Sequence, residues 1–184
     1  KEKTVLVEPK IRIKTAPGFV IVGKPIILPS KVKIAGSRNI VESIYFVSTI
    51  SDTIIDASLP ISIMLSLKSE SGQLLEYTPK TVSFKQSVQS ISERIISEIP
   101  VQILNVKEDV QAFVSPQTVS LTVIGGTEFI SSLEPESLIV SVNFNDWNSK
   151  KQFYDLNVKT SKDVISWMDL SPKNVELVVT KRAN

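Results

Sequence analysis

The stretch PSKVKIAG at residues 29–36 returns in a longer form as PQTVSLTVIG at residues 116–125. Both copies open on a proline and then alternate apolar with polar residues, the pattern of a strand with one buried face. Both copies end at a glycine, where the backbone can turn without a Cβ clash. The repeated stretch therefore predicts the same half-buried strand in each half of the chain.

A short amphipathic segment follows each copy, at residues 37–44 and 127–133. Both segments place apolar residues at positions i, i+1 and i+4, which predicts a helix of two or three turns with one face on a core. These apolar residues are Ile40, Val41 and Ile44 in the first segment and Phe129, Ile130 and Leu133 in the second. Ser37 and Thr127 are the expected N-caps, because a hydroxyl can accept from the free N–H groups of the first turn.

Further matches extend the repeat to most of the chain. TPKTVSF at residues 78–84 resembles SPKNVEL at 171–177, and LSLK at 65–68 resembles LNVK at 156–159. The period of about 90 residues is too long for a solenoid repeat and fits two successive globular domains. We therefore expect one module over 1–90 and a second over 91–184.

The boundary between the modules is expected near residues 87–95. QSVQSISE at residues 86–93 is polar and lacks clear alternation, which favours a linker that runs into a strand. A helix is the alternative, because five apolar residues could form one helical stripe. These five are Val88, Ile91, Ile95, Ile96 and Ile99.

The predicted fold class is mostly β, a β-rich α+β architecture in which each module has several short strands, polar turns such as residues 69–73, and one short helix. The residues expected in the two cores are the apolar members of the repeated segments. In module 1 they are Val32, Ile34, Ile40, Ile44, Leu65, Leu67 and Val82, and in module 2 they are Val119, Leu121, Phe129, Leu133, Leu156, Val158 and Val175.

The composition excludes several kinds of chemistry. The chain has no Cys and no His, so disulfides, Cys/His zinc sites and His-based catalysis are excluded. Residues 1–90 hold 12 basic and 7 acidic side chains, and residues 91–184 hold 9 and 12. No Lys/Arg-rich run is present, so nucleic acid is not an expected partner. No stretch reaches the roughly 18–20 apolar residues of a membrane span. Because the chain begins at Lys1, we interpret it as a piece of a longer protein.

The order of these segments resembles the YbbR domain, in two copies that cover nearly the whole chain. The order is a Pro-led strand ending at Gly, a short amphipathic helix, an Ile-Asp pair, an alternating strand and a second Pro-led strand. In the first copy the pair is Ile55-Asp56. The second copy departs from the pattern, because its helix follows a Gly-Gly pair and its acidic position is shifted to Asn145-Asp146.

The resemblance implies a β-rich fold with no known catalytic residues. It also implies a tandem array behind one N-terminal membrane helix, facing out of the cytoplasm at the periplasm or cell surface. In that family the implied role is to regulate a membrane-bound diadenylate cyclase, the enzyme that makes cyclic di-AMP. A protein partner is therefore expected, and the membrane is expected to be reached only through the parent's anchor.

Three pairs of acidic residues could suggest general acid and base catalysis: Asp52 with Asp56, Glu108 with Asp109, and Glu134 with Glu136. A paired-carboxylate site needs two acids that converge across a cleft. Solvated loops are the preferred interpretation of the last two pairs. Asp56 is expected to bond turn N–H groups at a strand end. No catalytic residue is therefore predicted.

Three other features have a functional and a structural interpretation. Gly125-Gly126-Thr127 could hold an anion at a helix N-terminus, but a tight strand-to-helix turn is preferred. Lys150-Lys151 could contact lipid or an acidic partner, but a solvated turn is preferred. Trp147 and Trp167-Met168 could anchor an interface, but core or edge cover is preferred. No cofactor or metal site is predicted.

The function expected from the sequence is a non-catalytic, extracytoplasmic interaction and regulatory segment of a membrane-anchored protein, acting on a membrane diadenylate cyclase. The alternative is an extracellular spacer or adhesion-type array of β modules. An enzyme is not expected.

Overall fold

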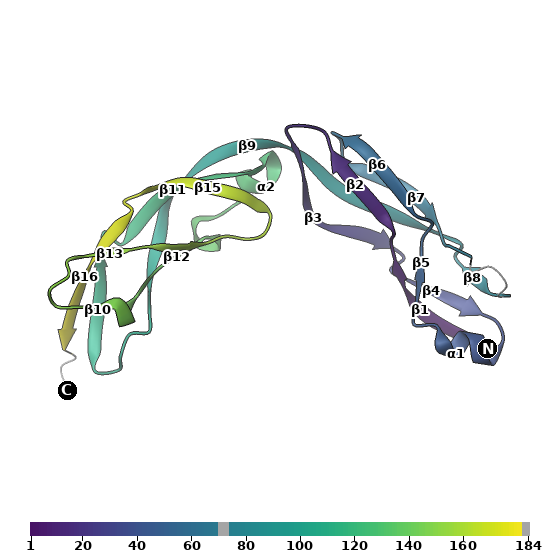
Figure 1. Ribbon diagram of the computed structural model, residues 1–184, viewed down its shortest axis with the longest axis horizontal. Helices are drawn as coiled ribbons and strands as arrows, with labels where there is room; N and C mark the ends of the chain where they lie inside the picture. Colours follow the sequence, from purple (N-terminus) through teal and green to yellow (C-terminus); the bar gives the residue numbers. More distant parts are fainter. Residues whose placement is uncertain (70–73, 182–184) are drawn as a thin grey trace. The chain divides into compact units, whose positions relative to one another are not determined.

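The computed structural model describes residues 1–69 and 74–181 (Figure 1). Strands dominate and only short helices accompany them in the described residues, so the predicted mostly-β class is confirmed. The chain divides into two compact units, Lys1–Ser90 and Ile91–Asn184. Except for Ser69, the turn expected at 69–73 lies outside the described residues.

Unit 1 is built from strands, with one short helix among its described residues. The elements are β1 (Glu2–Glu8), β2 (Ile11–Thr15), β3 (Phe19–Leu28), β4 (Lys31–Ala35), α1 (Arg38–Ser43), β5 (Phe46–Ser48), β6 (Asp52–Ala57), β7 (Ile61–Ser66), β8 (Glu76–Thr78) and the first part of β9 (Thr81–Leu104). One sheet has the order β5-β1-β4-β8, in which β1 pairs antiparallel with β4 and parallel with β5. β2 pairs parallel with β6, and β9 pairs antiparallel with both β3 and β7.

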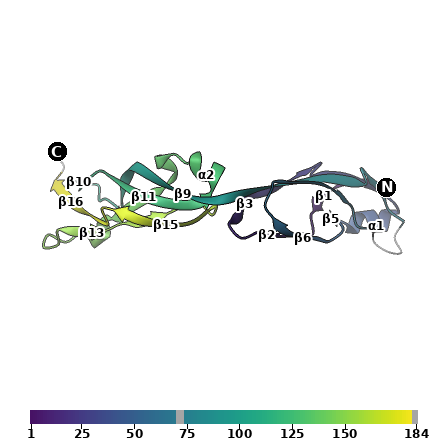
Figure 2. The same ribbon diagram turned by 90° about the horizontal axis from the view of Figure 1, so that it is seen from above.

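Unit 2 begins within β9 and uses the same kinds of element. The others are β10 (Val110–Ser115), β11 (Thr118–Gly126), α2 (Thr127–Ser131), η1 (Pro135–Ser137), β12 (Ile139–Asn143), η2 (Phe144–Asp146), β13 (Phe153–Asp155), β14 (Asn157–Lys159), β15 (Val164–Ser171) and β16 (Asn174–Lys181). Here β9 pairs antiparallel with β11 and parallel with β12, and β11 pairs antiparallel with β15. β10, β16 and β13 form a second sheet (Figure 2).

Corresponding strands pair in the same way in the two units. β3 pairs with β9 in unit 1 as β10 pairs with β16 in unit 2, and each pair ends at a repeated proline. β7 joins the first pair antiparallel and β13 joins the second. The peptide bonds before Pro29, Pro79, Pro116 and Pro172 are cis. The segments matched around these prolines therefore lie in matched strands. The match of residues 65–68 with 156–159 is wrong, because the first ends β7, which pairs with β9, and the second lies in β14, which pairs with β12.

The expected linker near 87–95 is wrong, because β9 is one strand from Thr81 to Leu104. The helical alternative is also wrong, since Ile95 is 69% exposed while its neighbour Ile96 is buried. The alternation of the strand is interrupted by a β-bulge at Glu98, whose φ is 58°. The bulge lies beyond the stretch 86–93, which lacks a regular apolar pattern for another reason: the polar Gln86 takes a buried position between Phe84 and Val88, and residues 89–95 are partly or fully exposed.

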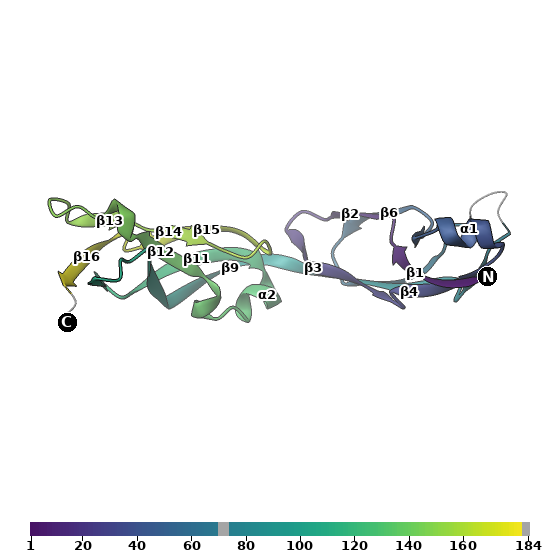
Figure 3. The same cartoon turned by 90° about the horizontal axis from the view of Figure 1, so that it is seen from below.

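Both helices are shorter than predicted, with six residues in α1 and five in α2. Ser37 occupies the N-cap of α1, but its side chain makes no capping hydrogen bond. Thr127 is the first residue of α2, and Gly126 is the N-cap. The two predicted hydroxyl caps are therefore wrong. α1 lies beside β1 in unit 1 (Figure 3).

Most of the predicted core is buried, but the helical faces are turned differently from the expectation. Val41 of α1 and Ile130 of α2 are the buried helical residues. Five predicted core residues are only half-buried: Ile40, Ile44, Phe129, Leu156 and Val158. Among the described residues, unit 1 has one hydrophobic cluster and unit 2 has two, one that includes Val123 and one that includes Tyr154.

Candidate interaction site

The segment that leaves α1 exposes large apolar side chains at the surface of unit 1. β5 pairs parallel with the end of β1, with Phe46 opposite Leu6 and Val47 opposite Val7. Because side chains alternate along a strand, Val47 enters the core while Phe46 remains 56% exposed. Tyr45 directly before it is 75% exposed. Large apolar side chains that are exposed side by side can mark an interaction surface.

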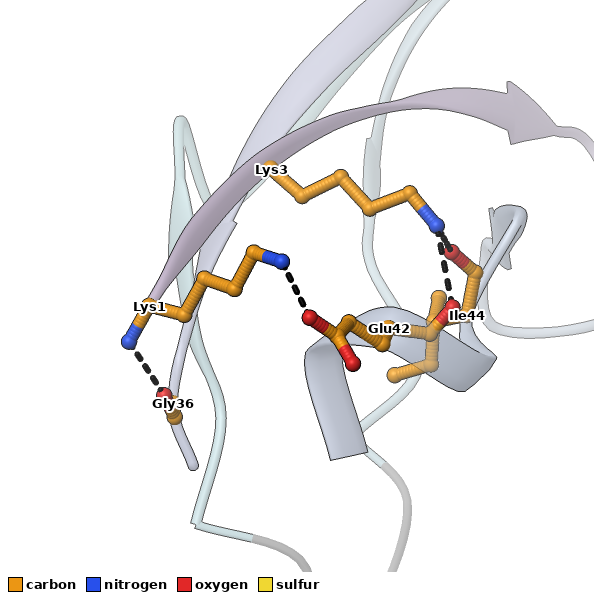
Figure 4. A network of polar contacts seen from close by, with 5 residues as sticks. All are labelled: Lys1, Lys3, Gly36, Glu42 and Ile44. Carbon is orange, nitrogen blue, oxygen red and sulfur yellow. Dashed lines mark hydrogen bonds and ion pairs between the residues drawn. The ribbon is translucent and has the colours of Figure 1, made fainter. Parts of the chain in front are cut away.

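Lys3 of β1 fixes the position of this segment (Figure 4). Its Nζ donates to the backbone carbonyls of Glu42, at 3.2 Å, and Ile44, at 2.6 Å. These carbonyls lie at the C-terminal end of α1, where a cation is favourable. The same ammonium lies 4.4 Å from the centre of the Tyr45 ring, within the range of a cation–π contact. Lys1 adds an exposed ion pair to the carboxylate of Glu42.

A hollow of about 440 Å³ opens beside Tyr45 and Phe46. The described residues that line it combine basic, aromatic and hydroxyl side chains and include neither Asp nor Glu. These residues are Lys10, Lys68, Tyr45, Phe46, Tyr77, Ser43, Ser48, Thr49 and Ser51. The hollow can therefore offer positive charge, hydrogen-bond donors and ring faces to a ligand.

Backbone contacts hold the two lysines of this hollow around Thr49. The Thr49 hydroxyl is buried and accepts a hydrogen bond from the backbone N–H of Lys10, at 2.9 Å. On the other side, the N–H of Lys68 donates to the carbonyl of Ser48, at 2.8 Å. Lys10 and Lys68 are distant in sequence, and the strand pairing brings their backbones to the same segment.

A second hollow, of about 640 Å³, adjoins the first, and both are bordered by Lys10 and Ser51. Its lining adds Arg12 and Asp52. At the start of β6, the Asp52 carboxylate accepts a hydrogen bond from the backbone N–H of Thr53, at 2.7 Å. We call the two hollows together the Lys10 groove.

Only one of the groove's cations forms an ion pair among the described residues. Lys10 lies 3.0 Å from Glu8, and both side chains are about half exposed. Such surface pairs contribute only about 0–1 kcal/mol, so this pair is easily exchanged for another. Arg12 and Lys68 have no ion pair in the part of the chain that the structure describes. The groove therefore presents cations that an acidic ligand can reach.

The structure places the three pairs of acidic residues, for which no catalytic role was predicted, in different parts of the chain. Asp52 borders the Lys10 groove, whereas Asp56 sits at a β-bulge with a φ of 54°. The expected hydrogen bond of Asp56 to turn N–H groups does not occur among the described residues. Asp56 instead stands out by its left-handed backbone conformation. Glu108 and Asp109 lie in the turn before β10. Glu134 and Glu136 lie at the start of η1. No group of three Asp or Glu that could hold a metal occurs in residues 1–69 and 74–181.

The Gly125-Gly126-Thr127 stretch joins β11 to α2 as a tight connection. A Cβ on Gly125 would come within 2.9 Å of the Ile130 side chain and 3.3 Å of the Asp163 carbonyl. Glycine is therefore required here for close packing of the helix on its own strand.

Lys150 and Lys151 lie in an exposed loop that Tyr154 holds in place. The buried Tyr154 hydroxyl is 2.8 Å from the carbonyl of Lys151 and accepts from the N–H of Asn148, at 3.0 Å. The Lys151 ammonium lies 5.0 Å from the same ring. The loop is thus ordered by contacts within unit 2.

The predicted aromatic candidates lie at the surface of unit 2 and are partly covered. Trp147 is 39% exposed and stacks on the buried Phe144, with ring centres 6.0 Å apart. Trp167 and Met168 lie on β15, at the edge of its sheet, and are exposed to a similar degree.

Sequence reasoning did not find the Lys10 groove. One signal was present: Tyr45 and Phe46 stand together directly after a short amphipathic helix. The lysines gave no local sequence signal, because Lys10 and Lys68 are 58 positions apart in the sequence and come together only through strand pairing.

These features define a mostly-β chain of two units with an open, basic and aromatic groove in unit 1. No protein-family model matches the chain, and no curated protein matches it. The chain is similar to a solved structure, a YbbR-like protein from Streptococcus pneumoniae TIGR4. The two are 15% identical, the match covers 99% of this chain and 96% of that one, and the TM-score is 0.37. This solved structure is described as YbbR-like, the same family name as in the resemblance seen in the sequence.

No helix in residues 1–69 and 74–181 has both the length and the apolar composition needed to cross a membrane.

Proposed function

We propose that this chain is a non-catalytic interaction segment that acts by binding another protein. The observation that supports this proposal is the Lys10 groove, where Tyr45 and Phe46 are exposed beside available cations. Exposed aromatic side chains are frequent anchors of protein interfaces. An open groove of this kind can contact a partner's surface without enclosing a substrate.

The sequence resemblance suggests the setting and the partner. We propose that the segment belongs to a membrane-anchored parent outside the cytoplasm and regulates a membrane diadenylate cyclase. A surface groove in a module of this size suits a transient contact, which buries less than about 1,200 Å² in total. A regulator with such a contact can be released from the enzyme and bound again.

The test compares the full-length parent with a version that lacks residues 1–184, each expressed beside the cyclase. We expect the deletion to change the cellular level of cyclic di-AMP and to reduce co-purification of the two proteins. Expression level and membrane insertion of the parent serve as controls. Unchanged nucleotide and unchanged co-purification would reject the cyclase-regulator role and leave the structural spacer as the better description.

A further inference from the structure

We propose, on the basis of the interaction function above, that the Lys10 groove binds an acidic segment of the partner protein. In this arrangement, carboxylates of the partner pair with Lys10 and Lys68, and apolar parts of the segment pack on Tyr45 and Phe46. The proposal rests on the charge, the rigidity and the size of the groove.

The charge of the groove is one-sided where the aromatic residues lie. The 440 Å³ hollow is lined by two lysines and, among the described residues, by no acid. Lys68 has no ion pair in the described part of the chain, and the pair of Lys10 with Glu8 is exposed. A carboxylate that enters the hollow therefore gains two cations and displaces only a weak surface contact.

Arg12 extends the positive charge along β2. Ile11 and Ile13 pack toward the core of unit 1, so Arg12 between them points to the opposite, solvent side, and Lys10 directly before β2 is exposed. Arg12 borders the 640 Å³ hollow, two residues beyond Lys10. Arg12 thus adds a third cation next to Lys10, in a hollow that Asp52 also borders, and several cations fit several carboxylates of an extended chain better than one small anion.

The aromatic wall of the groove is held in place before a ligand arrives. Lys3 bonds the two carbonyls that flank Ser43 and contacts the Tyr45 ring. Because the segment is fixed by contacts outside the groove, little conformational freedom is lost on binding. Each of the two hollows is within the roughly 300–1,000 Å³ range of pockets that take drug-sized ligands, which is enough for several side chains.

The test is an NMR titration of this chain with a synthetic octapeptide of alternating Glu and Ser. We expect saturable shifts of the backbone amides around the groove, including Ser43, Thr49 and Lys68. A peptide of alternating Lys and Ser should produce no saturable shift. Raising the salt concentration should weaken the binding of the acidic peptide, since the contacts are exposed charges.

Two matched double variants distinguish peptide binding by the groove from a general effect of positive charge on the affinity. The double variant Lys10→Gln/Lys68→Gln should weaken peptide binding about fivefold, because two exposed pairs are lost. The control Lys31→Gln/Lys85→Gln removes the same charge from exposed positions of unit 1 outside the groove. It should leave the affinity within about twofold of the unmodified chain.

Several results would overturn the proposal. These are the absence of saturable shifts at the groove, or an equal loss of affinity in both double variants. Equally tight binding at these residues of phosphatidylglycerol vesicles or inorganic phosphate would assign the groove to a different anion. Concentration-dependent self-association through the groove would assign it to a second copy.

In the full-length parent, Lys10→Gln/Lys68→Gln should reproduce the effect of deleting residues 1–184 on cyclic di-AMP. If the deletion acts and the double variant does not, the regulatory function stands and the groove inference fails. If the acidic peptide binds and the deletion has no effect, the regulatory function fails and the groove inference stands.

Discussion

Three acidic residues adopt the left-handed backbone conformation at β-bulges: Asp56, Glu98 and Asp169. For an L-residue this backbone conformation costs roughly 1–2 kcal/mol of conformational free energy, whereas glycine adopts it freely. Two of the three are Asp, which tolerates the conformation better than most residues. Glu98 is therefore the position where the backbone cost is largest.

At Glu98, replacement by glycine should leave the stability unchanged or raise it by up to about 1 kcal/mol. Replacement by valine should lower it by about 1–2 kcal/mol, because a branched Cβ fits the left-handed region poorly. Urea denaturation of both variants measures the difference. Glu93 is the control: it lies in the regular ladder opposite Ile124, so glycine there should destabilise the protein. Equal effects of glycine at the two positions would contradict this account of the bulge.

The helical face of α2 gives a second prediction. Ile130 is 1% exposed, so Ile130→Ala should cost about 2–5 kcal/mol of unfolding free energy. Phe129 is only half-buried, so Phe129→Ala should cost less, although it removes a larger side chain. Thermal or urea unfolding of the two variants ranks the costs. A larger loss for Phe129 would show that the helix is turned as the sequence pattern first predicted.

At the scale of elements, α1 depends on β1 for its position. Lys3→Met keeps the length of the side chain but removes the hydrogen bonds to Glu42 and Ile44. We expect it to cost about 1 kcal/mol, because charged hydrogen bonds of partly exposed groups are lost. Amide hydrogen exchange in residues 38–46 should become faster.

Lys33→Met is the matched control for Lys3→Met. Among the described residues, the Lys33 side chain forms an exposed ion pair with Glu2, at 3.1 Å, so its loss should change stability by no more than about 0.5 kcal/mol. Faster exchange in residues 38–46 for both variants, or for neither, would contradict the anchoring role of Lys3.

An element could be predicted from the sequence where its pattern of apolar and polar residues is regular. Val32 and Ile34 alternate without interruption, and the strand they predict is β4. In β9 the polar Gln86 is buried in place of an apolar residue, and residues 89–95 are partly or fully exposed, so a continuous strand looked like a linker. The helices were predicted in the right places but too long, since apolar spacing alone does not determine where a short helix ends.

At the scale of the whole molecule, the repeated prolines and alternating segments were sufficient to predict the mostly-β class. The candidate site was not predictable in the same way. Lys10, Thr49 and Lys68 come together through pairing of distant strands, and no local pattern marks such a meeting. Charge counts did indicate a basic first half, but not which of its lysines share a groove.

The central claim is that unit 1 contacts a partner protein through the Lys10 groove. The most direct test is photo-crosslinking in cells that produce the full-length parent, with the photoreactive residue placed at Phe46. Phe113 is the control position, because it is a Phe of unit 2 that is exposed to a similar degree, 51% against 56%. The account predicts a specific adduct with the cyclase from position 46 and none from position 113. No adduct from position 46, or the same adducts from both positions, would contradict it.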